Sequence, residues 1–196
     1  KILELEIIDE VAKQYREETG KMLEVRVCVA GPTDLYLQAF GATSYADAYH
    51  ILALDIEDFI KQAFVAAKNF KIKIIALDEP SLGINDRIQF SDANIVSALT
   101  VASTYARKQG ADVEIHLHSP LKYKLVCETP INVIGFEYAA TPSYLSLLDK
   151  KVLEDSNTYI RLGVSRTDIS SLIGIINENY GVNVWKEKEY MQKIVT

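Results

Sequence analysis

Polar side chains stand where several apolar stretches of the sequence end. Three stretches show this most clearly, and the polar residues that follow them are Asp78 and Glu79, His116 and His118, and Glu137. Carboxylates bind amino groups and metal ions, and imidazoles bind metal ions or carry protons. Polar groups at the carboxyl ends of buried parallel strands form the sites of α/β enzymes. We therefore expect an enzyme-type cleft built from these residues.

Composition excludes several classes of partner. The chain has 196 residues, enough for one domain with a sizeable core, and a formal net charge of -6. It has no cluster of basic residues and no apolar run near the roughly 20 residues that cross a bilayer. We therefore expect neither a nucleic acid nor a membrane as partner. The two cysteines, Cys28 and Cys127, are too few for a disulfide scaffold and fit a reducing cytoplasm.

Hydrophobic periodicity predicts alternating strands and helices. The predicted strands cover residues 24–30, 72–77, 113–117, 131–136 and 159–164. The predicted helices cover residues 7–19, 47–69, 91–109, 142–153, 168–180 and 185–195, with a short helical turn at 121–127. Gly20 and Gly110 are expected to end helices, and Ser91 and Thr141 to begin them.

This alternation is typical of a parallel sheet with crossover helices. A closed barrel of eight strands needs about 250 residues, more than the chain offers. Two alternatives remain open: an open sheet, or a (β/α)8 TIM barrel that is partial, without its first and last strands. The chain begins with lysine, so we expect a piece of a longer product or a processed terminus.

Five short segments carry a resemblance to a known family. In chain order they are Gly31-Pro32-Thr33, Leu77-Asp78-Glu79-Pro80-Ser81-Leu82, Ile115-His116-Leu117-His118, Phe136-Glu137 and Leu162-Gly163-Val164. This ordered set, spanning about residues 25–170, resembles the catalytic barrel of cobalamin-independent methionine synthase. The resemblance implies that residues 1–196 form a single methionine-synthase-like (β/α)8 barrel domain.

The resemblance also implies an activity. The expected enzyme is like a 5-methyltetrahydropteroyltriglutamate-homocysteine S-methyltransferase, in which zinc activates the thiol of homocysteine for methyl transfer. By family position, His118 and Glu137 are metal ligands, and Asp78 binds the amino group of the substrate. The implied methyl donor is a methylfolate or a methylated corrinoid protein.

Part of the family's zinc ligand set has no counterpart. A family cysteine falls on Pro120, and no cysteine follows Val164 to supply the last ligand. Cys127 is the one nearby thiol that could substitute. The alternative function is therefore a degenerate member without zinc, acting as a binding or accessory subunit of a methyltransferase. A third interpretation within the superfamily is uroporphyrinogen decarboxylase. That enzyme would need more arginines at the barrel mouth than the two candidates in this sequence, Arg161 and Arg166.

Each candidate residue also has a purely structural interpretation. Asp78 could cap the turn that follows its strand, and the two histidines could be hydrogen-bonded structural residues. Glu137 could form a salt bridge with Arg166. The Gly31-Pro32 pair is either a simple turn or a substrate-facing loop.

Two further features are expected to serve packing. Cys28 is predicted to be a small buried hydrophobic residue. The aromatic residues Tyr36, Phe40, Tyr45 and Tyr49 are predicted to pack together rather than to stack on a cofactor.

Overall fold

The computed structural model describes residues 2–84, 90–165 and 169–183. These residues fall into two compact units, Lys1–Gly163 and Val164–Thr196. The first unit contains the whole sheet and every predicted site residue. Within the second, helix α7 (Ile169–Tyr180) confirms the helix expected at 168–180. The helix predicted at 185–195 lies outside the described residues, and the expectation of a single domain stays a prediction.

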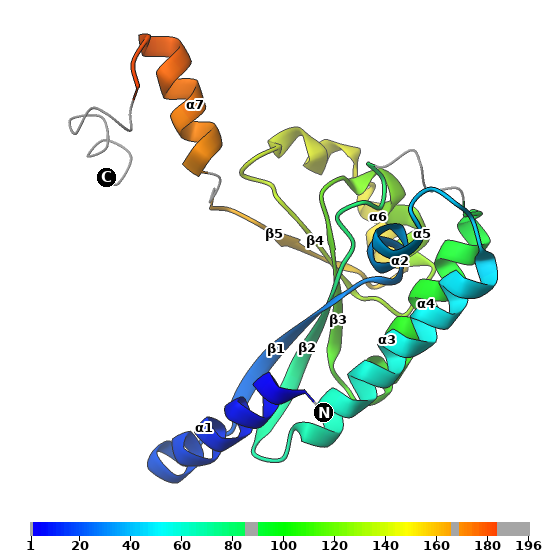
Figure 1. The fold of residues 1–196 in the computed structure, drawn as a ribbon, viewed down its shortest axis with the longest axis vertical. Coiled ribbons are helices and arrows are strands. Elements are labelled where there is room, and N and C mark those ends of the chain that lie inside the picture. Colours follow the sequence, from blue (N-terminus) through cyan, green and yellow to red (C-terminus); the bar gives the residue numbers. More distant parts are fainter. Residues whose placement is uncertain (1, 85–89, 166–168, 184–196) are drawn as a thin grey trace. The chain divides into compact units, whose positions relative to one another are not determined.

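A parallel sheet of five strands forms the centre of the first unit (Figure 1). The strands are β1 (Leu23–Ala30), β2 (Phe70–Asp78), β3 (Asp112–Leu117), β4 (Val133–Phe136) and β5 (Tyr159–Leu162). They lie side by side in the order in which they occur in the chain, and all neighbouring pairs are parallel. The predicted α/β class is thus confirmed. Among the described residues the sheet is open, with β1 and β5 at its edges.

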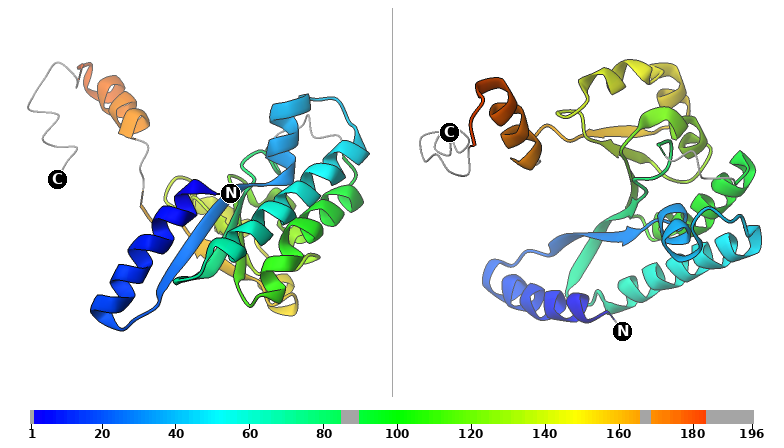
Figure 2. Two further views of the ribbon diagram at one scale, coloured as in Figure 1. Left: turned by 60° about the horizontal axis from the view of Figure 1, so that its bottom comes forward. Right: turned by 45° about the horizontal axis from the view of Figure 1, so that its top comes forward.

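The helices of the first unit cover one face of this curved sheet, and no described helix of that unit covers the other face, called the open face below (Figure 2). The longest are α1 (Leu3–Thr19), α3 (Ala46–Ala66) and α4 (Asp92–Lys108), and the shorter α5 (Tyr123–Cys127) and α6 (Lys150–Asp155) continue the layer. No described helix is long and apolar enough to cross a lipid bilayer.

Most of the residues predicted to begin or end a helix do so in the structure. Gly20 ends α1 in the left-handed conformation (φ 69°), where its N–H reaches the carbonyl of Arg16, and Gly110 follows α4 with φ 78°. The Ser91 hydroxyl accepts a hydrogen bond from the N–H of Asn94 and so caps α4.

Two expectations about helices are wrong. The Gly31-Pro32 pair, expected as a turn or a substrate-facing loop, is instead the start of helix α2 (Pro32–Phe40). The single helix expected at 142–153 is instead a 3-10 helix, Pro142–Leu147, followed by α6. Thr141 makes no side-chain cap, whereas Asp149 caps α6 by accepting from the N–H of Lys151. Helix α6 therefore begins directly after its cap residue, Asp149.

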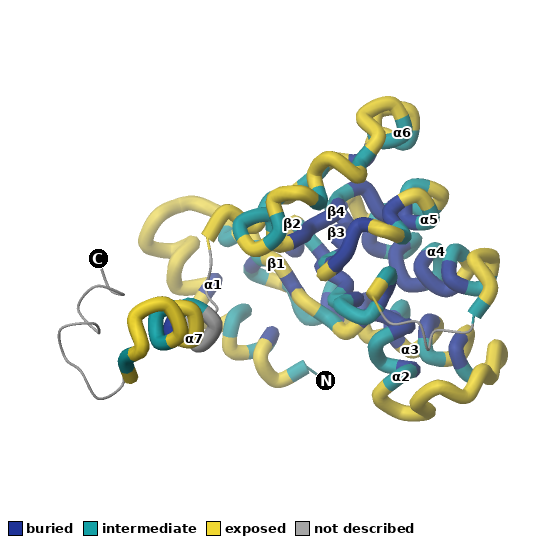
Figure 3. Tube along the Cα trace, turned by 90° about the horizontal axis from the view of Figure 1, so that it is seen from above, coloured by how far each residue is buried: buried dark blue, intermediate teal, exposed yellow. Residues whose placement is uncertain are grey.

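The core lies between the sheet and its helices, where buried residues gather in Figure 3. The strands contribute Ile75, Leu77, Val113, Ile115, Leu117 and Ile134, all with essentially no exposed surface. Side chains alternate along a strand, so the intervening residues face the other side of the sheet. On β3 those residues are Glu114 and His116, which makes the open face polar.

The four aromatic residues predicted to pack together are in ring contact, although Phe40 and Tyr45 are exposed. Tyr36 and Tyr49 are buried, and their rings meet edge to face at 5.8 Å between centroids. Phe90 stacks on Tyr49 at 4.1 Å, and Phe40 stacks on Tyr36 at 4.9 Å. This cluster fixes α2 against α3 just beyond the end of β1.

Candidate functional site

The ends of β2, β3 and β4 bring the predicted site residues to one edge of the sheet. Asp78, the last residue of β2, pairs in register with His116 of β3. His116 in turn pairs with Gly135 of β4, two residues before Glu137. The rings of His116 and His118 lie 5.3 Å apart, edge to face. The two-residue spacing places both imidazoles on the same side of the strand.

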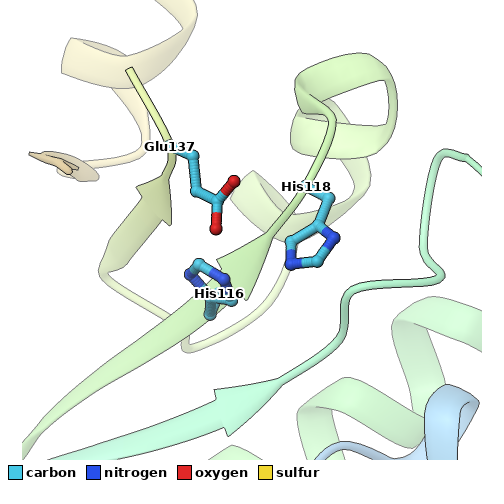
Figure 4. A group of neighbouring side chains, drawn as sticks. All are labelled: His116, His118 and Glu137. Carbon is cyan, nitrogen blue, oxygen red and sulfur yellow. The ribbon is translucent and has the colours of Figure 1, made fainter. Parts of the chain in front are cut away.

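His116, His118 and Glu137 form a cluster whose potential ligand atoms all lie within 4.8 Å of one another. Figure 4 shows the Glu137 carboxylate pointing from the end of β4 toward both imidazole rings. His116 is half-buried, and the other two side chains are exposed. The structure therefore brings His118 and Glu137 together and adds His116. The sequence placed His116 on the same side of the strand as His118 but did not assign it as a metal ligand.

The donor set of this cluster suits zinc. Two imidazole nitrogens and one carboxylate oxygen make up the protein ligands of one common type of catalytic zinc site. Three protein ligands leave a fourth position open for water or a substrate. The zinc expected from the sequence thus has a chemically suitable set of residues.

Asp78 lies outside the cluster but lines the same cavity as His116 and Glu137. The cavity has a volume of about 300 Å³ and opens on the polar face of the sheet. Among the described residues, the Asp78 side chain has no hydrogen-bond partner, so its carboxylate does not cap the turn after β2. A half-buried carboxylate without a protein partner is a suitable acceptor for a cationic ligand group.

The base of the cavity contains an ion-pair network that sequence reasoning missed. Glu114 of β3 is buried, and it accepts hydrogen bonds from Arg26 of β1 and Arg161 of β5. Burial opposes ionisation of Glu114, but the two arginines outweigh it and hold the pKa of this carboxyl below its ordinary value. The network therefore holds Glu114 as an anion between two cations.

Glu79, next to Asp78, has a structural role at the start of α2. Its two carboxylate oxygens accept the N–H groups of Thr33 and Asp34, at 2.8 and 3.0 Å. Complete burial raises the pKa of Glu79 to about 8, although these N–H donors act to lower it. The Gly31-Pro32 pair is thus the start of helix α2, and the N–H groups of Thr33 and Asp34 in its first turn already donate to Glu79.

The cysteines do not complete the metal cluster. Cys28 is exposed, so the expectation that it is buried is wrong: its position on β1 faces the open side of the sheet. Cys127 is half-buried at the end of α5, and neither thiol belongs to the metal-ligand cluster found among the described residues. Pro120 opens a short 3-10 helix after His118. Arg166, the alternative partner of Glu137, lies outside the described residues.

Comparison with known proteins gives no assignment. No protein-family model matches the chain, and no curated protein matches it either.

Proposed function

We propose that this chain belongs to a (β/α)8 barrel of the methionine-synthase type, which transfers a methyl group to the thiol of homocysteine. The main support is the meeting of His116, His118 and Glu137 at the ends of neighbouring parallel strands. The strand order supports the barrel, because a doubly wound sheet reverses its order while a barrel keeps the order of the chain. The polar open face would then line the barrel interior.

The metal in this proposal is zinc, held by His116, His118 and Glu137. Zinc lowers the pKa of a coordinated thiol, which is then a thiolate at neutral pH. His116 would be the third protein ligand, in place of a family cysteine that has no counterpart in this sequence. The three residues lie at the strand ends, where α/β barrels bind their substrates.

The chain's own residues would orient the substrate. Asp78 lines the cavity, has no hydrogen-bond partner in the described part of the chain, and would bind the ammonium group of homocysteine. The register between Asp78 and His116 places the two on adjacent strands at one level. A substrate held by Asp78 therefore has its thiol side chain free to extend toward the metal cluster. The methyl group would come from a methylfolate or a methylated corrinoid protein.

A second candidate is a related subunit that binds a ligand without zinc. It is favoured by Pro120 after His118 and by the position of Cys28 and Cys127 outside the cluster. In this alternative the cavity binds a small molecule, and methyl transfer occurs on a partner enzyme.

Cobalt substitution tests the proposal. Co²⁺ is added to the metal-free protein, followed by homocysteine or by homoserine, in which a hydroxyl replaces the thiol. We expect a sulfur-to-cobalt charge-transfer absorption in the near ultraviolet with homocysteine but not with homoserine. His118→Ala and Glu137→Gln should lose it, whereas His50→Ala, at the exposed His50 of α3, should keep it. Methionine formation from homocysteine and methylcobalamin then measures methyl transfer. No absorption with homocysteine would favour the second candidate.

A further inference from the structure

Arg26, Glu114 and Arg161 come from three different strands and meet at the base of the cavity. Arg26 donates from Nε to one oxygen of Glu114 at 3.1 Å and from Nη2 to the other at 3.2 Å. Arg161 donates from Nη1 to both oxygens at 2.6 Å. Each oxygen of Glu114 therefore has two donors, and the carboxylate is saturated.

Gly135 makes room for this arrangement. A Cβ atom on Gly135 would lie 2.6 Å from one oxygen of Glu114, closer than real Cβ contacts come. Any other residue at position 135 would push the carboxylate away from its arginines. The absence of a side chain at Gly135 therefore lets the network form on the open face of the sheet, unlike a chance ion pair between surface side chains.

The guanidinium of Arg161 keeps unused donors. An arginine has five N–H groups, and Arg161 directs only Nη1 to Glu114. Within the described part of the chain, its Nε and Nη2 have no protein partner. The Arg161 side chain is 55% exposed while that of Glu114 is 1% exposed, so the free donors are accessible from the cavity. With one carboxylate between two arginines, the network carries one surplus positive charge.

This surplus charge lines the same cavity as Asp78. Arg161 reaches from β5 across to Glu114 on β3, and β3 is the direct neighbour of β2, which ends at Asp78. The cavity is thus lined by the Asp78 carboxylate, which has no hydrogen-bond partner among the described residues, and by the free donors of Arg161. An α-amino acid carries the two complementary groups, an ammonium and a carboxylate, bonded to one α-carbon.

We propose that Arg161 binds the carboxylate of an amino-acid thiol whose ammonium group is held by Asp78, which makes Arg161 the residue that selects the substrate's acid group. The flat guanidinium fork matches a carboxylate with two parallel N–H donors. This assignment rests on the proposed function for the thiol, but the carboxylate site stands on the cavity alone.

The test compares two thiols that differ only in the carboxylate. Homocysteine and 3-aminopropane-1-thiol are titrated calorimetrically into the zinc-loaded protein and into the variants Arg161→Gln and Arg161→Lys. We expect the wild-type protein to bind homocysteine about 10- to 100-fold more tightly than the amine. Both variants should lose most of this preference while binding the amine unchanged. Arg161→Lys keeps a cation beside Glu114, so we expect this variant to fold like the wild-type protein.

Arg107→Gln serves as the matched control, because Arg107 also pairs with a carboxylate, Asp112, but does not line the cavity. It should keep the full preference for homocysteine. Equal affinity of the wild-type protein for the two thiols, or an equal loss for both in Arg161→Lys, would overturn the role of Arg161.

A metal-free measurement separates this inference from the proposed function. L-2-aminobutyrate lacks only the sulfur of homocysteine and so needs no metal. It should bind the metal-free wild-type protein and bind Arg161→Lys at least about tenfold more weakly. That result sustains the carboxylate site even where zinc-dependent thiol binding fails. No difference between wild type and variant would reject the site even where thiol binding succeeds.

Discussion

The buried carboxylate of Glu79 occupies the space beside Gly31 that any other side chain would need. A Cβ atom on Gly31 would lie 2.3 Å from Cγ of Glu79 and 2.4 Å from one of its oxygens. Gly31 has φ -78°, an angle open to every residue, so the requirement for glycine comes from packing and not from the backbone. The contact joins the end of β2 to the start of α2.

Gly31→Ala is therefore expected to destabilise the protein by about 3 kcal/mol, because it overpacks the site and displaces the cap of α2. Urea unfolding of wild type and variant measures the difference. Gly110→Ala is the control: its φ of 78° is unfavourable for alanine, but open space surrounds it. That change should cost only about 1 kcal/mol. A Gly31→Ala protein as stable as Gly110→Ala would show that Glu79 can move away freely.

The ionisation of Glu79 should make stability fall as pH rises from about 4.5 to about 8. Its pKa is about 8 in the fold against an ordinary value of 4.5, so the unfolded chain releases this proton first. Its favourable contribution is complete below pH 4.5 and is lost as pH rises through 8. The shift corresponds to roughly 3 to 5 kcal/mol.

Urea midpoints measured at about pH 5, 6.5 and 8 test this expectation. Glu79→Gln should lower stability at pH 5 but should flatten the decline toward pH 8. Glu17→Gln, at an exposed position of α1, should leave the decline as it is. A decline that persists unchanged in Glu79→Gln would assign it to another group.

Glu114 should have the opposite pH dependence. Its pKa is lowered from the ordinary 4.5, so the ionised form stabilises the fold above pH 4.5, and this contribution is lost as pH falls through the folded-state pKa. Because both arginines are partly exposed, we expect only a small loss of stability as pH falls below 4.5. Glu114→Gln should lack this loss in acid unfolding. An identical acid transition in the variant would contradict the ion-pair network.

The strands were predictable because buried parallel strands are almost continuous apolar runs, as in Ile74-Ile75-Ala76-Leu77. Helix α2 was not, because Gly31-Pro32 is as typical of a turn as of a helix start, and what decides between them is Glu79, 46 residues away from Thr33. Likewise the helix expected at 142–153 divides where the Asp149 side chain caps α6, while the expected cap at Thr141 does not form.

The candidate site was predictable where it follows a motif position or the alternation of side chains along a strand. His118 and Glu137 came from motif position, and the spacing of His116 from His118 placed both on one side of β3. The network of Arg26, Glu114 and Arg161 was hidden, because its members lie 88 and 47 residues apart and meet only through the order of the strands. The exposure of Cys28 has the same cause, since it depends on which face of β1 the helices leave open.

Zinc content per chain, measured by elemental analysis on the purified protein, tests the metal centre most directly. We expect about one zinc per chain, as at other three-ligand sites, with and without homocysteine. His116→Ala, His118→Ala and Glu137→Gln should each lose the metal, and His50→Ala should retain it. A wild-type protein without zinc in either condition, or variants at the cluster that keep a full complement, would contradict a zinc centre at His116, His118 and Glu137.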